Sequence, residues 1–248
     1  MITKRNCSII AFEGLDCSFK ETNYNRFLNH LIEMRGAYND LSSYFSVHNE
    51  SFPRYGDWSC AFVEGWLNNT FDREMLKENP EIRATFYALD RYAYWYAKNE
   101  DGTRRIDLLC NGDNKFRYFV FDRYTMSNFI YNPNHPDDID IRDLNFDNTK
   151  FKVPNPDIVV WFRMRSFDKL CELIAAKQEK DANELDIEYL RKVWERSEQI
   201  IASDIFVQAG IKLIVIECLD EEGNPRPRTE LDWAVWSERL PLLLNISK

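Results

Sequence analysis

A short polar segment near the N-terminus combines residue types that handle phosphate. Residues 13–22 have the sequence EGLDCSFKET and follow an apolar run. In phosphate-binding loops of the pattern GxxxxGK[ST], glycines let backbone N–H groups wrap the phosphates, the lysine reaches the terminal phosphates, and the hydroxyl binds Mg²⁺. Gly14 and Lys20 match this pattern, whereas Phe19 replaces the second glycine and Glu21 the hydroxyl residue. The segment predicts a phosphate-binding turn that departs from the pattern at two positions.

Two further motifs place an arginine beside aromatic residues. In FPRYG, residues 52–56, Pro53 restricts the backbone and can aim Arg54 at a phosphate, which a guanidinium grips with two hydrogen bonds. The alternative is a turn with a solvated arginine. In FYALDR, Tyr87 and Arg91 are four residues apart and share a helix face, so the ring can stack on a base while the arginine bonds the base edge. The alternative is a core aromatic beside a surface arginine.

The segment DRYTMSNFIY, residues 122–131, places charged and amide side chains at the end of a predicted strand. The carboxylate of Asp122 can hold Mg²⁺ or orient an attacking oxygen, and Arg123 can neutralise phosphate charge. Asn128 can pair with a base edge. The alternative is an ion pair that ends the strand, but the combination with the other three motifs favours a nucleotide site.

The elements that must position these residues alternate along the chain. Apolar runs predict five strands, at residues 8–13, 43–49, 117–122, 157–163 and 212–217. Helix-like stretches lie between them, at residues 22–35, 81–96, 167–177 and 186–209. This alternation predicts an α/β fold with a five-stranded parallel sheet and helices on both faces. Ligands of such folds bind at the carboxyl ends of the strands, where the polar motifs cluster.

Length and composition narrow the class of protein. A chain of 248 residues fits a single α/β domain, with a surface loop insertion predicted at residues 133–156 and a turn followed by a short final helix near the C-terminus. The net charge of −9 argues against a nucleic-acid-binding surface. Six scattered cysteines favour a reduced intracellular protein, and no apolar stretch is long enough for a membrane span, so we expect a cytoplasmic location without a membrane partner.

In order and spacing the four motifs resemble those of thymidylate kinase, the P-loop enzyme that moves the γ-phosphoryl group of ATP onto dTMP. The matching pieces run from Ile9 to about Tyr131, and weaker ones cover residues 156–201. The specific combination is FPRYG, then YALDR, then DRYxxSNxxY.

The resemblance implies a role for each acceptor-side residue. Tyr87 would stack on thymine, Arg91 would bond its carbonyl edge, and Asn128 would contact the N3 side of the base. Tyr131 would lie against the sugar and disfavour a 2′-hydroxyl. The resemblance further implies that Asp16 meets the 3′-hydroxyl, that Arg54 and Arg123 hold the acceptor phosphate, and that Asp122 sits by Mg²⁺ and the transferring phosphate.

The donor side follows the family less closely. We expect ATP to be held by Gly14, Ser18, Lys20, Thr22, Lys177 and Lys180, with the last two on a lid around residues 177–184. The family often has an arginine in this lid, and lysine supplies the charge without the planar fork. Glu21 is a second candidate ligand of Mg²⁺, directly or through water. The resemblance also implies a homodimer.

Three functions are compatible with these motifs. The first is an active enzyme that converts dTMP to dTDP. The second is a catalytically impaired protein that still binds a deoxynucleoside monophosphate, which Phe19 would favour. The third is a kinase with a changed acceptor, such as dUMP or a modified pyrimidine nucleotide, because small pocket changes alter such preferences.

Overall fold

The fold is described from a computed structural model, which covers residues 6–37, 45–110, 115–135, 137–178 and 183–226.

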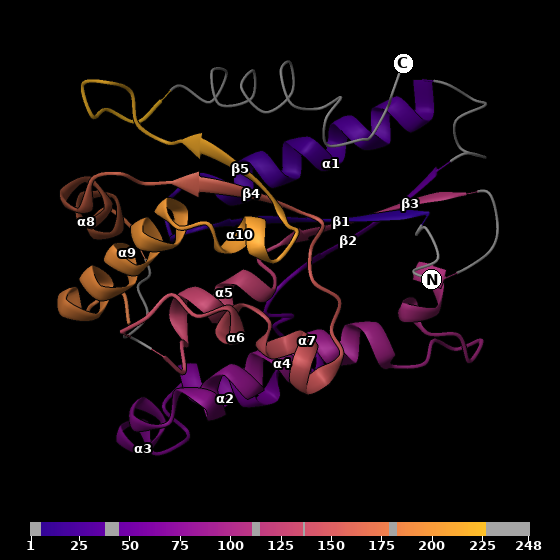
Figure 1. The fold of residues 1–248 in the computed structure, drawn as a ribbon, viewed down its shortest axis with the longest axis horizontal. Helices are drawn as coiled ribbons and strands as arrows, with labels where there is room; N and C mark the ends of the chain where they lie inside the picture. Colours follow the sequence, from indigo (N-terminus) through magenta and orange to yellow (C-terminus); the bar gives the residue numbers. More distant parts are fainter. Residues whose placement is uncertain (1–5, 38–44, 111–114, 136, 179–182, 227–248) are drawn as a thin grey trace.

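Five strands form one parallel sheet at the centre of the molecule (Figure 1). The sheet order is β2-β3-β1-β4-β5, so the chain passes from β1 outward to β2, back through β3, and across β1 to β4 and β5. All eight residues of β1 are buried, because this central strand has a neighbour on each side and helices on each face. The strands are β1 (Cys7–Gly14), β2 (Phe45–Ser51), β3 (Phe116–Asp122), β4 (Ile158–Arg163) and β5 (Lys212–Glu217).

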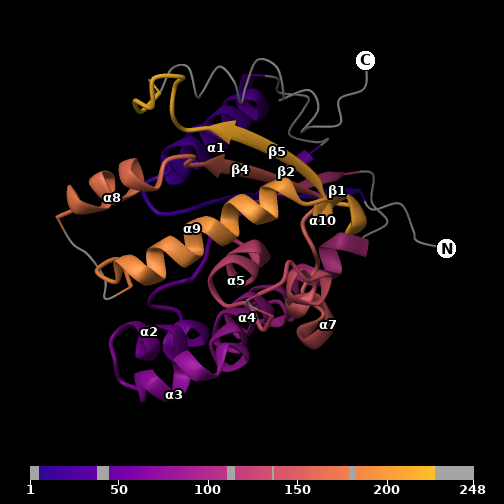
Figure 2. The same ribbon diagram turned by 60° about the vertical axis from the view of Figure 1, so that its left-hand side comes forward.

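Helices cover both faces of the sheet (Figures 1 and 2). Helix α1 lies along one face, while α4, α5 and α9 lie on the other, and α2 and α3 are farthest from the sheet. The larger helices are α1 (Lys20–Ala37), α4 (Pro80–Tyr96), α8 (Phe167–Ala175) and α9 (Ile187–Ala202). The shorter ones are η2 (Trp58–Cys60), α2 (Ala61–Leu67), α3 (Arg73–Glu78), η3 (Arg105–Cys110), α5 (Thr125–Tyr131), α6 (Ile141–Leu144), α7 (Phe146–Phe151) and α10 (Ile205–Gln208).

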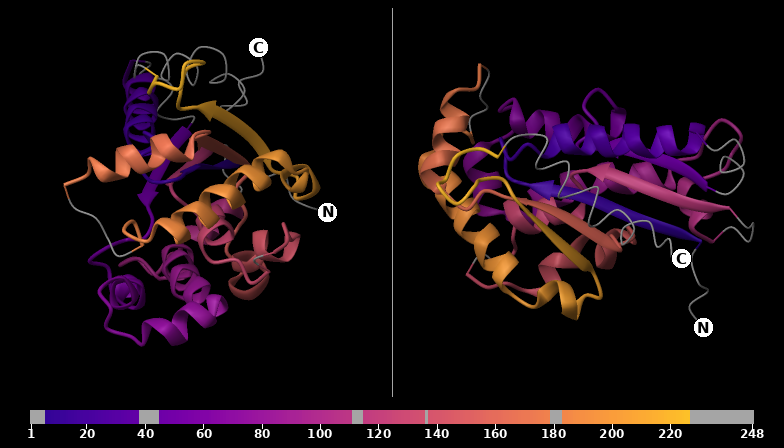
Figure 3. Two further views of the ribbon diagram at one scale, coloured as in Figure 1. Left: turned by 90° about the vertical axis from the view of Figure 1, so that its left-hand side faces the viewer. Right: turned by 90° about the horizontal axis from the view of Figure 1, so that it is seen from above.

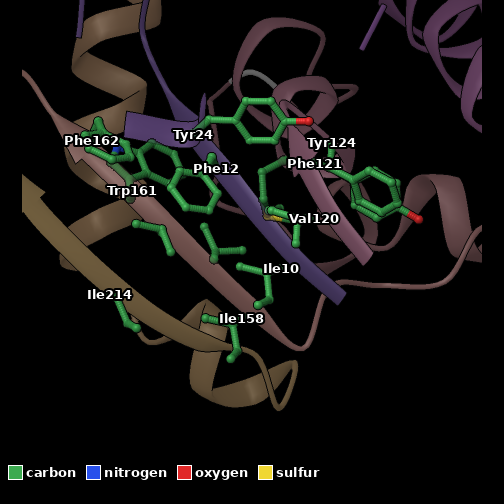
Figure 4. Packing of buried hydrophobic residues seen from close by; sticks show 14 of the residues in the cluster. Ile10, Phe12, Tyr24, Val120, Phe121, Tyr124, Ile158, Trp161, Phe162 and Ile214 are labelled. Atoms are coloured by element: carbon green, nitrogen blue, oxygen red, sulfur yellow. The ribbon is translucent and has the colours of Figure 1, made fainter. Parts of the chain in front are cut away.

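The main hydrophobic core lies between the sheet and these helices (Figure 4). Phe12 of β1 packs its ring against Tyr24 and Phe27 of α1 at centroid distances of 5.8 and 5.3 Å. On the other face, Trp95 of α4 contacts Phe119 of β3 at 4.9 Å. Both faces of the sheet are therefore buried, which holds the strand ends in place.

The predicted α/β fold is confirmed, with each of the five predicted strands found within two residues of its expected ends. The first two residues of the predicted strand 43–49, residues 179–182 of the predicted lid and the predicted C-terminal helix lie outside the described residues.

Two predictions about local structure are wrong. The predicted helix 186–209 is two helices, α9 and α10, because the chain is extended at Ser203, which ends α9. The stretch 133–156 is not a plain surface loop. It contains α6 and α7, whose Leu144 and Phe146 are buried, and these helices pack beside α4 and α5.

A search of the described helices finds none with the length and apolar character that a membrane crossing needs.

Candidate active site

The loop after β1 bends tightly at Gly14. Its φ angle of +151° is rare for residues with a side chain, and an added Cβ would lie 2.7 Å from the carbonyl oxygen of Phe162. A larger residue would therefore push β1 and β4 apart, which explains glycine at the first position of the phosphate-binding pattern.

Phe19 adopts a backbone conformation that glycine would hold without strain. Its φ angle is +61°, and Cys17 in the same loop has a φ angle of +59°. For an L-residue with a side chain the left-handed region costs about 1–2 kcal/mol. The half-buried Phe19 ring packs against the hydrophobic core. The loop thus keeps a glycine-like backbone at the position where the phosphate-binding pattern has glycine.

Lys20 begins α1 and forms a buried ion pair with Asp122 at the end of β3. The second carboxylate oxygen of Asp122 accepts a hydrogen bond from Ser51 Oγ at 3.2 Å. Burial, with the charge of Arg123, lowers the pKa of Lys20, while Asp122 opposes this effect. Helix α1 and strands β3 and β2 thereby place a lysine, a carboxylate and a hydroxyl together at the strand ends.

The other residues expected to contact donor nucleotide or metal lie around this pair. The hydroxyl of Ser18 is buried and has no hydrogen-bond partner among the described residues. Glu21 is exposed in the first turn of α1, and Thr22 is partly exposed. Within the described ranges, no three His, Cys, Asp or Glu side chains gather as a metal site. Any Mg²⁺ here would need phosphate and water oxygens to complete its shell, which is its usual mode of binding.

Arg123 follows Asp122 and forms an ion pair with Asp16 of the loop after β1. Its guanidinium carbon lies 5.6 Å from the ring centroid of Tyr131, which is a cation–π distance. Although burial acts to raise the pKa of Asp16, the charges of Arg123 and Lys20 lower it overall. Asp16 is therefore ionised at neutral pH and ties the first loop to the end of β3.

Glu13 connects this loop to α5. It is fully buried and accepts hydrogen bonds from the backbone N–H of Tyr124 at 2.7 Å and from Ser127 Oγ at 2.9 Å. Burial raises the pKa of Glu13, and the hydrogen bond from Ser127 opposes this shift. The residue just before Gly14 is thus joined to the first turn of α5.

A cavity of about 350 Å³ opens between the strand ends and helices α2, α4, α5 and α9. It brings together seven residues that the sequence motifs singled out, namely Asp16, Tyr87, Arg91, Arg123, Asn128, Tyr131 and Lys177. Its remaining wall includes Ser51, Pro53, Trp66, Arg83, Asn132, Asn183, Glu184 and Tyr189. The volume lies in the usual range for small-molecule sites.

Asp147 of α7 positions two side chains of this cavity through hydrogen bonds. Its carboxylate accepts Arg91 Nε at 2.5 Å and Asn128 Nδ2 at 2.9 Å. Asn128 Nδ2 also donates to the carbonyl oxygen of Ala84. All of these groups are buried. Arg91 Nη2 is buried without a partner in the described part of the chain, and the residue lines the cavity. Asp147 therefore fixes the direction of an arginine and an amide that face the cavity.

Arg54 does not line the cavity. Its Nε donates to Asp90 Oδ1 at 2.9 Å, and its Nη2 donates to Ser59 Oγ at 2.6 Å. Its neighbour Tyr55 lines the cavity instead. The interpretation of Pro53 as aiming Arg54 into the cleft is therefore wrong in this conformation, because the buried carboxylate of Asp90 draws the guanidinium to α4.

The segment before α9 supplies one wall. Lys177 Nζ bonds the buried carboxylate of Glu184 at 2.5 Å, and Glu184 raises the pKa of Lys177 against the opposing effect of burial. Arg73 donates to Asn183 Oδ1 at 2.7 Å, which connects α3 to this segment. Lys180 lies outside the described residues.

Sequence motifs missed several residues of the site. Arg83 is four residues before Tyr87, so the helical spacing could have placed it on the same face of α4. Asp147 carried no local signal, because it lies in a helix of six residues, too short for a visible period, and acts only through Arg91 and Asn128, which are distant in sequence. Ser51 and Tyr189 likewise lay outside the four motifs.

Comparisons with known proteins agree with this architecture. A scan against protein-family profiles and a search of curated protein sequences give no match. Solved structures do match. The structure of thymidylate kinase from Candida albicans matches with a TM-score of 0.59 and 16% sequence identity. The match covers 97% of this chain and 94% of the Candida chain. The structure of thymidylate kinase from Ehrlichia chaffeensis matches with a TM-score of 0.56 and 15% sequence identity. The match covers 96% of this chain and 98% of the Ehrlichia chain.

The chain therefore has the fold of a P-loop kinase, a five-stranded parallel sheet with helices around it. Within that class its architecture matches the thymidylate kinase form. At this level of identity the likeness concerns the fold, and the activity is argued from the site.

Proposed function

We propose that this protein is a nucleoside monophosphate kinase that transfers the γ-phosphoryl group of ATP to dTMP. The observation that carries the proposal is the cavity beside the buried pair of Lys20 and Asp122. It gathers the rings of Tyr87 and Tyr131, the guanidinium groups of Arg91 and Arg123, the carboxylate of Asp16 and the amide of Asn128. Phosphoryl transfer needs little covalent chemistry from the protein and depends on positioning and charge neutralisation, which these residue types supply.

The hydrogen-bond pattern of the cavity favours a thymine or uracil base. Arg91 Nη2 has no partner among the described residues and can donate to a ring carbonyl oxygen. The amide nitrogen of Asn128 is engaged by Ala84 and Asp147. Its oxygen accepts a long hydrogen bond from Asn132 Nδ2 at 3.4 Å and has a second lone pair that can accept a ring N3–H. Thymine offers this combination of an O4 acceptor and an N3–H donor. Cytosine offers the reverse pair, which would leave buried groups unpaired.

Other residues hold the sugar and phosphate of the acceptor in this proposal. Tyr87 stacks on the base, Tyr131 lies against the sugar, and Asp16 accepts a hydrogen bond from the 3′-hydroxyl. Arg123 would exchange part of its contact with Asp16 for the acceptor phosphate. Because a guanidinium bonds phosphate through two parallel N–H groups, it can orient the attacking oxygen as well as neutralise it.

On the donor side, Lys20 releases Asp122 and turns to the phosphates of ATP. Asp122 is then free to hold Mg²⁺, which needs only one or two protein carboxylates beside phosphate and water oxygens. When bound, the ion would neutralise charge on the transferring group. The unpartnered hydroxyl of Ser18 and the backbone of residues 14–20 would line the phosphates.

A coupled assay with ATP, Mg²⁺ and dTMP tests the proposal, with dCMP as the matched acceptor. We expect turnover with dTMP and at least a hundredfold lower kcat/KM with dCMP, because the reversed donor and acceptor leave Arg91 and Asn128 unpaired. Absence of turnover in a protein that binds dTMP by calorimetry would overturn the kinase activity.

A second function, nucleotide binding without transfer, is favoured by one feature, the strained Phe19 at a glycine position. Calorimetry with ATP distinguishes the two functions. If the native loop is impaired, the double variant Phe19→Gly and Glu21→Ser will bind ATP much more tightly than the native chain. If the loop is competent, native and variant proteins will bind ATP with similar affinity and both will turn over dTMP.

A further inference from the structure

The side-chain amide of Asn128 has two ends that would meet a pyrimidine base in opposite ways. Its oxygen can accept the N3–H of thymine or uracil, whereas its nitrogen could donate to the unprotonated N3 of cytosine. A half-turn of the amide group exchanges the two ends while the shape of the side chain stays nearly the same. The orientation of this amide therefore decides which pyrimidine it can bind.

Two acceptors among the described residues fix this orientation. Asn128 Nδ2 donates to the carbonyl oxygen of Ala84 at 2.9 Å and to Asp147 Oδ1 at 2.9 Å. Both N–H groups of the amide are thereby engaged, so a further partner can bind only the oxygen. Because Asn128 and Asp147 are buried, turning the amide would set its oxygen against two acceptors in a place without bulk water. The oxygen is therefore the end that remains for a ligand.

Asp147 is the side-chain member of this pair of acceptors, and Arg91 holds it in place. Asp147 Oδ2 accepts Arg91 Nε at 2.5 Å, in an ion pair whose side chains are both almost fully buried. With Oδ2 engaged by the guanidinium, Oδ1 is directed at Asn128. The contact on the other side of the amide is less decisive, because Asn132 meets Asn128 Oδ1 through an amide that can itself turn. Asp147 thus connects the two residues proposed to bind the base.

We propose that Asp147 is a positioning residue that sets the preference of the site for bases with an N3–H over cytosine. It acts through the amide of Asn128, which it holds with the oxygen free to accept. This inference rests on the proposed function, because it takes Asn128 as the residue that meets N3 of the base. It assigns part of the pyrimidine selectivity to α7, an element without any of the four sequence motifs.

The variant Asp147→Asn removes the fixed orientation while it keeps the size of the side chain. The oxygen of the new amide should stay on Arg91, which can only donate, so its nitrogen would face Asn128. Asn128 then meets one acceptor, the carbonyl oxygen of Ala84, and one donor. Either orientation of its amide now makes one matched and one mismatched contact, so both should be populated.

Calorimetry of dTMP and dCMP with the native chain and with Asp147→Asn measures this effect. We expect the ratio of the two affinities to fall by about tenfold or more in Asp147→Asn, as the loss of one discriminating buried hydrogen bond would give. Part of the preference for dTMP should remain, because Arg91 can only donate and still disfavours the amino group of cytosine.

Two controls separate this role from a general loss of packing. Asp90→Asn makes the same change at another buried carboxylate that binds an arginine, Arg54, but that does not line the cavity. It should keep the native ratio even if it lowers stability. In a background of Asn128→Ala, Asp147→Asn should leave the ratio unchanged, because the amide through which it acts is absent. The same fall in that background would overturn the proposal.

The variant Asp147→Ser keeps the test open if Asp147→Asn does not fold. Its hydroxyl can donate as well as accept, so the preference for dTMP should fall by a smaller factor. An unchanged ratio in the folded variants, with turnover of dTMP intact, would overturn the role of Asp147 and leave the proposed kinase activity standing. A lowered ratio in a protein without turnover would support the role and contradict only the transfer. A native chain that binds neither nucleotide would contradict both proposals.

Discussion

The two halves of the candidate site are built in opposite ways. On the acceptor side, a buried carboxylate holds Arg91 and Asn128, and both residues line the cavity before any ligand binds. On the donor side, Phe19 holds a strained backbone angle and Lys20 is engaged by Asp122. The residues proposed to hold the base are organised before a ligand arrives, whereas Lys20, like Arg123 at the acceptor phosphate, must exchange an internal ion pair for ligand contacts. The affinity for the acceptor should therefore tolerate changes that abolish transfer.

The largest effect expected from this contrast follows removal of Asp147. Asp147→Ala leaves the buried guanidinium of Arg91 without its partner, which should lower the free energy of unfolding by about 3–5 kcal/mol. Urea unfolding measures the loss, and calorimetry should find dTMP binding weakened by more than tenfold in the folded fraction.

The exposed Asp137→Ala is the control for Asp147→Ala and should change stability by less than about 0.5 kcal/mol. Asp147→Asn retains an acceptor for Arg91 and should fold where the alanine variant does not. Equal stability of Asp147→Ala and Asp137→Ala would mean that the acceptor side is not organised by this carboxylate.

Lys20→Met probes the donor side alone. We expect kcat to fall by about 10²–10³-fold, the usual loss when one preorganised donor to a transferring group is removed, because the neutral side chain cannot stabilise phosphate charge. The affinity for dTMP should stay within about twofold, since Lys20 does not line the cavity. Equal losses in kcat and in dTMP affinity would contradict the separation of the two halves.

The variant Arg54→Ala tests whether Arg54 stabilises the fold or binds the ligand. Arg54→Ala removes the partner of the buried Asp90 and should destabilise the fold by about 2 kcal/mol. Affinity for dTMP should change little, because the side chain points at α4. Arg104→Ala, at an exposed ion pair with Asp107, is the control and should leave the free energy of unfolding nearly unchanged. A large loss of dTMP affinity in Arg54→Ala would instead place this arginine on the acceptor phosphate.

The smallest expected effect concerns the backbone at residue 19. Phe19→Ala and Phe19→Gly both remove the ring, but only glycine relieves the positive φ angle. Thermal or urea unfolding should find the glycine variant more stable than the alanine variant by about 1 kcal/mol. Equal stability of the two variants would mean that the native loop does not hold this angle in solution.

The parts of the fold that were predictable from the sequence are those with a repeating signal. All five strands were found, and β1, β3 and β4, which are buried over most of their length, give the clearest apolar runs. The helices α4 and α8 were also found. The short helices α2, α3, α5, α6 and α7 have seven residues or fewer, which is too few turns for a helical period to stand out.

The cavity residues that could be predicted from the sequence are those that belong to a recognisable motif. Tyr87, Arg91, Arg123, Asn128 and Tyr131 do meet at one cavity. The direction of Arg54 could not be predicted, because it depends on Asp90 and Ser59, which are near it only in the folded chain. The carboxylate of Asp147 was missed for the same physical reason, since its partners are 56 and 19 residues away.

The two hydrogen bonds of Glu13 have a mechanical consequence. Because the residue before Gly14 is joined to the first turn of α5, the phosphate loop cannot swing away from Asn128 and Tyr131 without breaking buried hydrogen bonds to a carboxylate. A movement of the loop relative to α5 would therefore break both hydrogen bonds. If a nucleotide binds as proposed, we expect any closure to come from the opposite wall of the cavity, formed by α2 and residues 183–184 before α9; α2 lies away from the sheet in Figure 3.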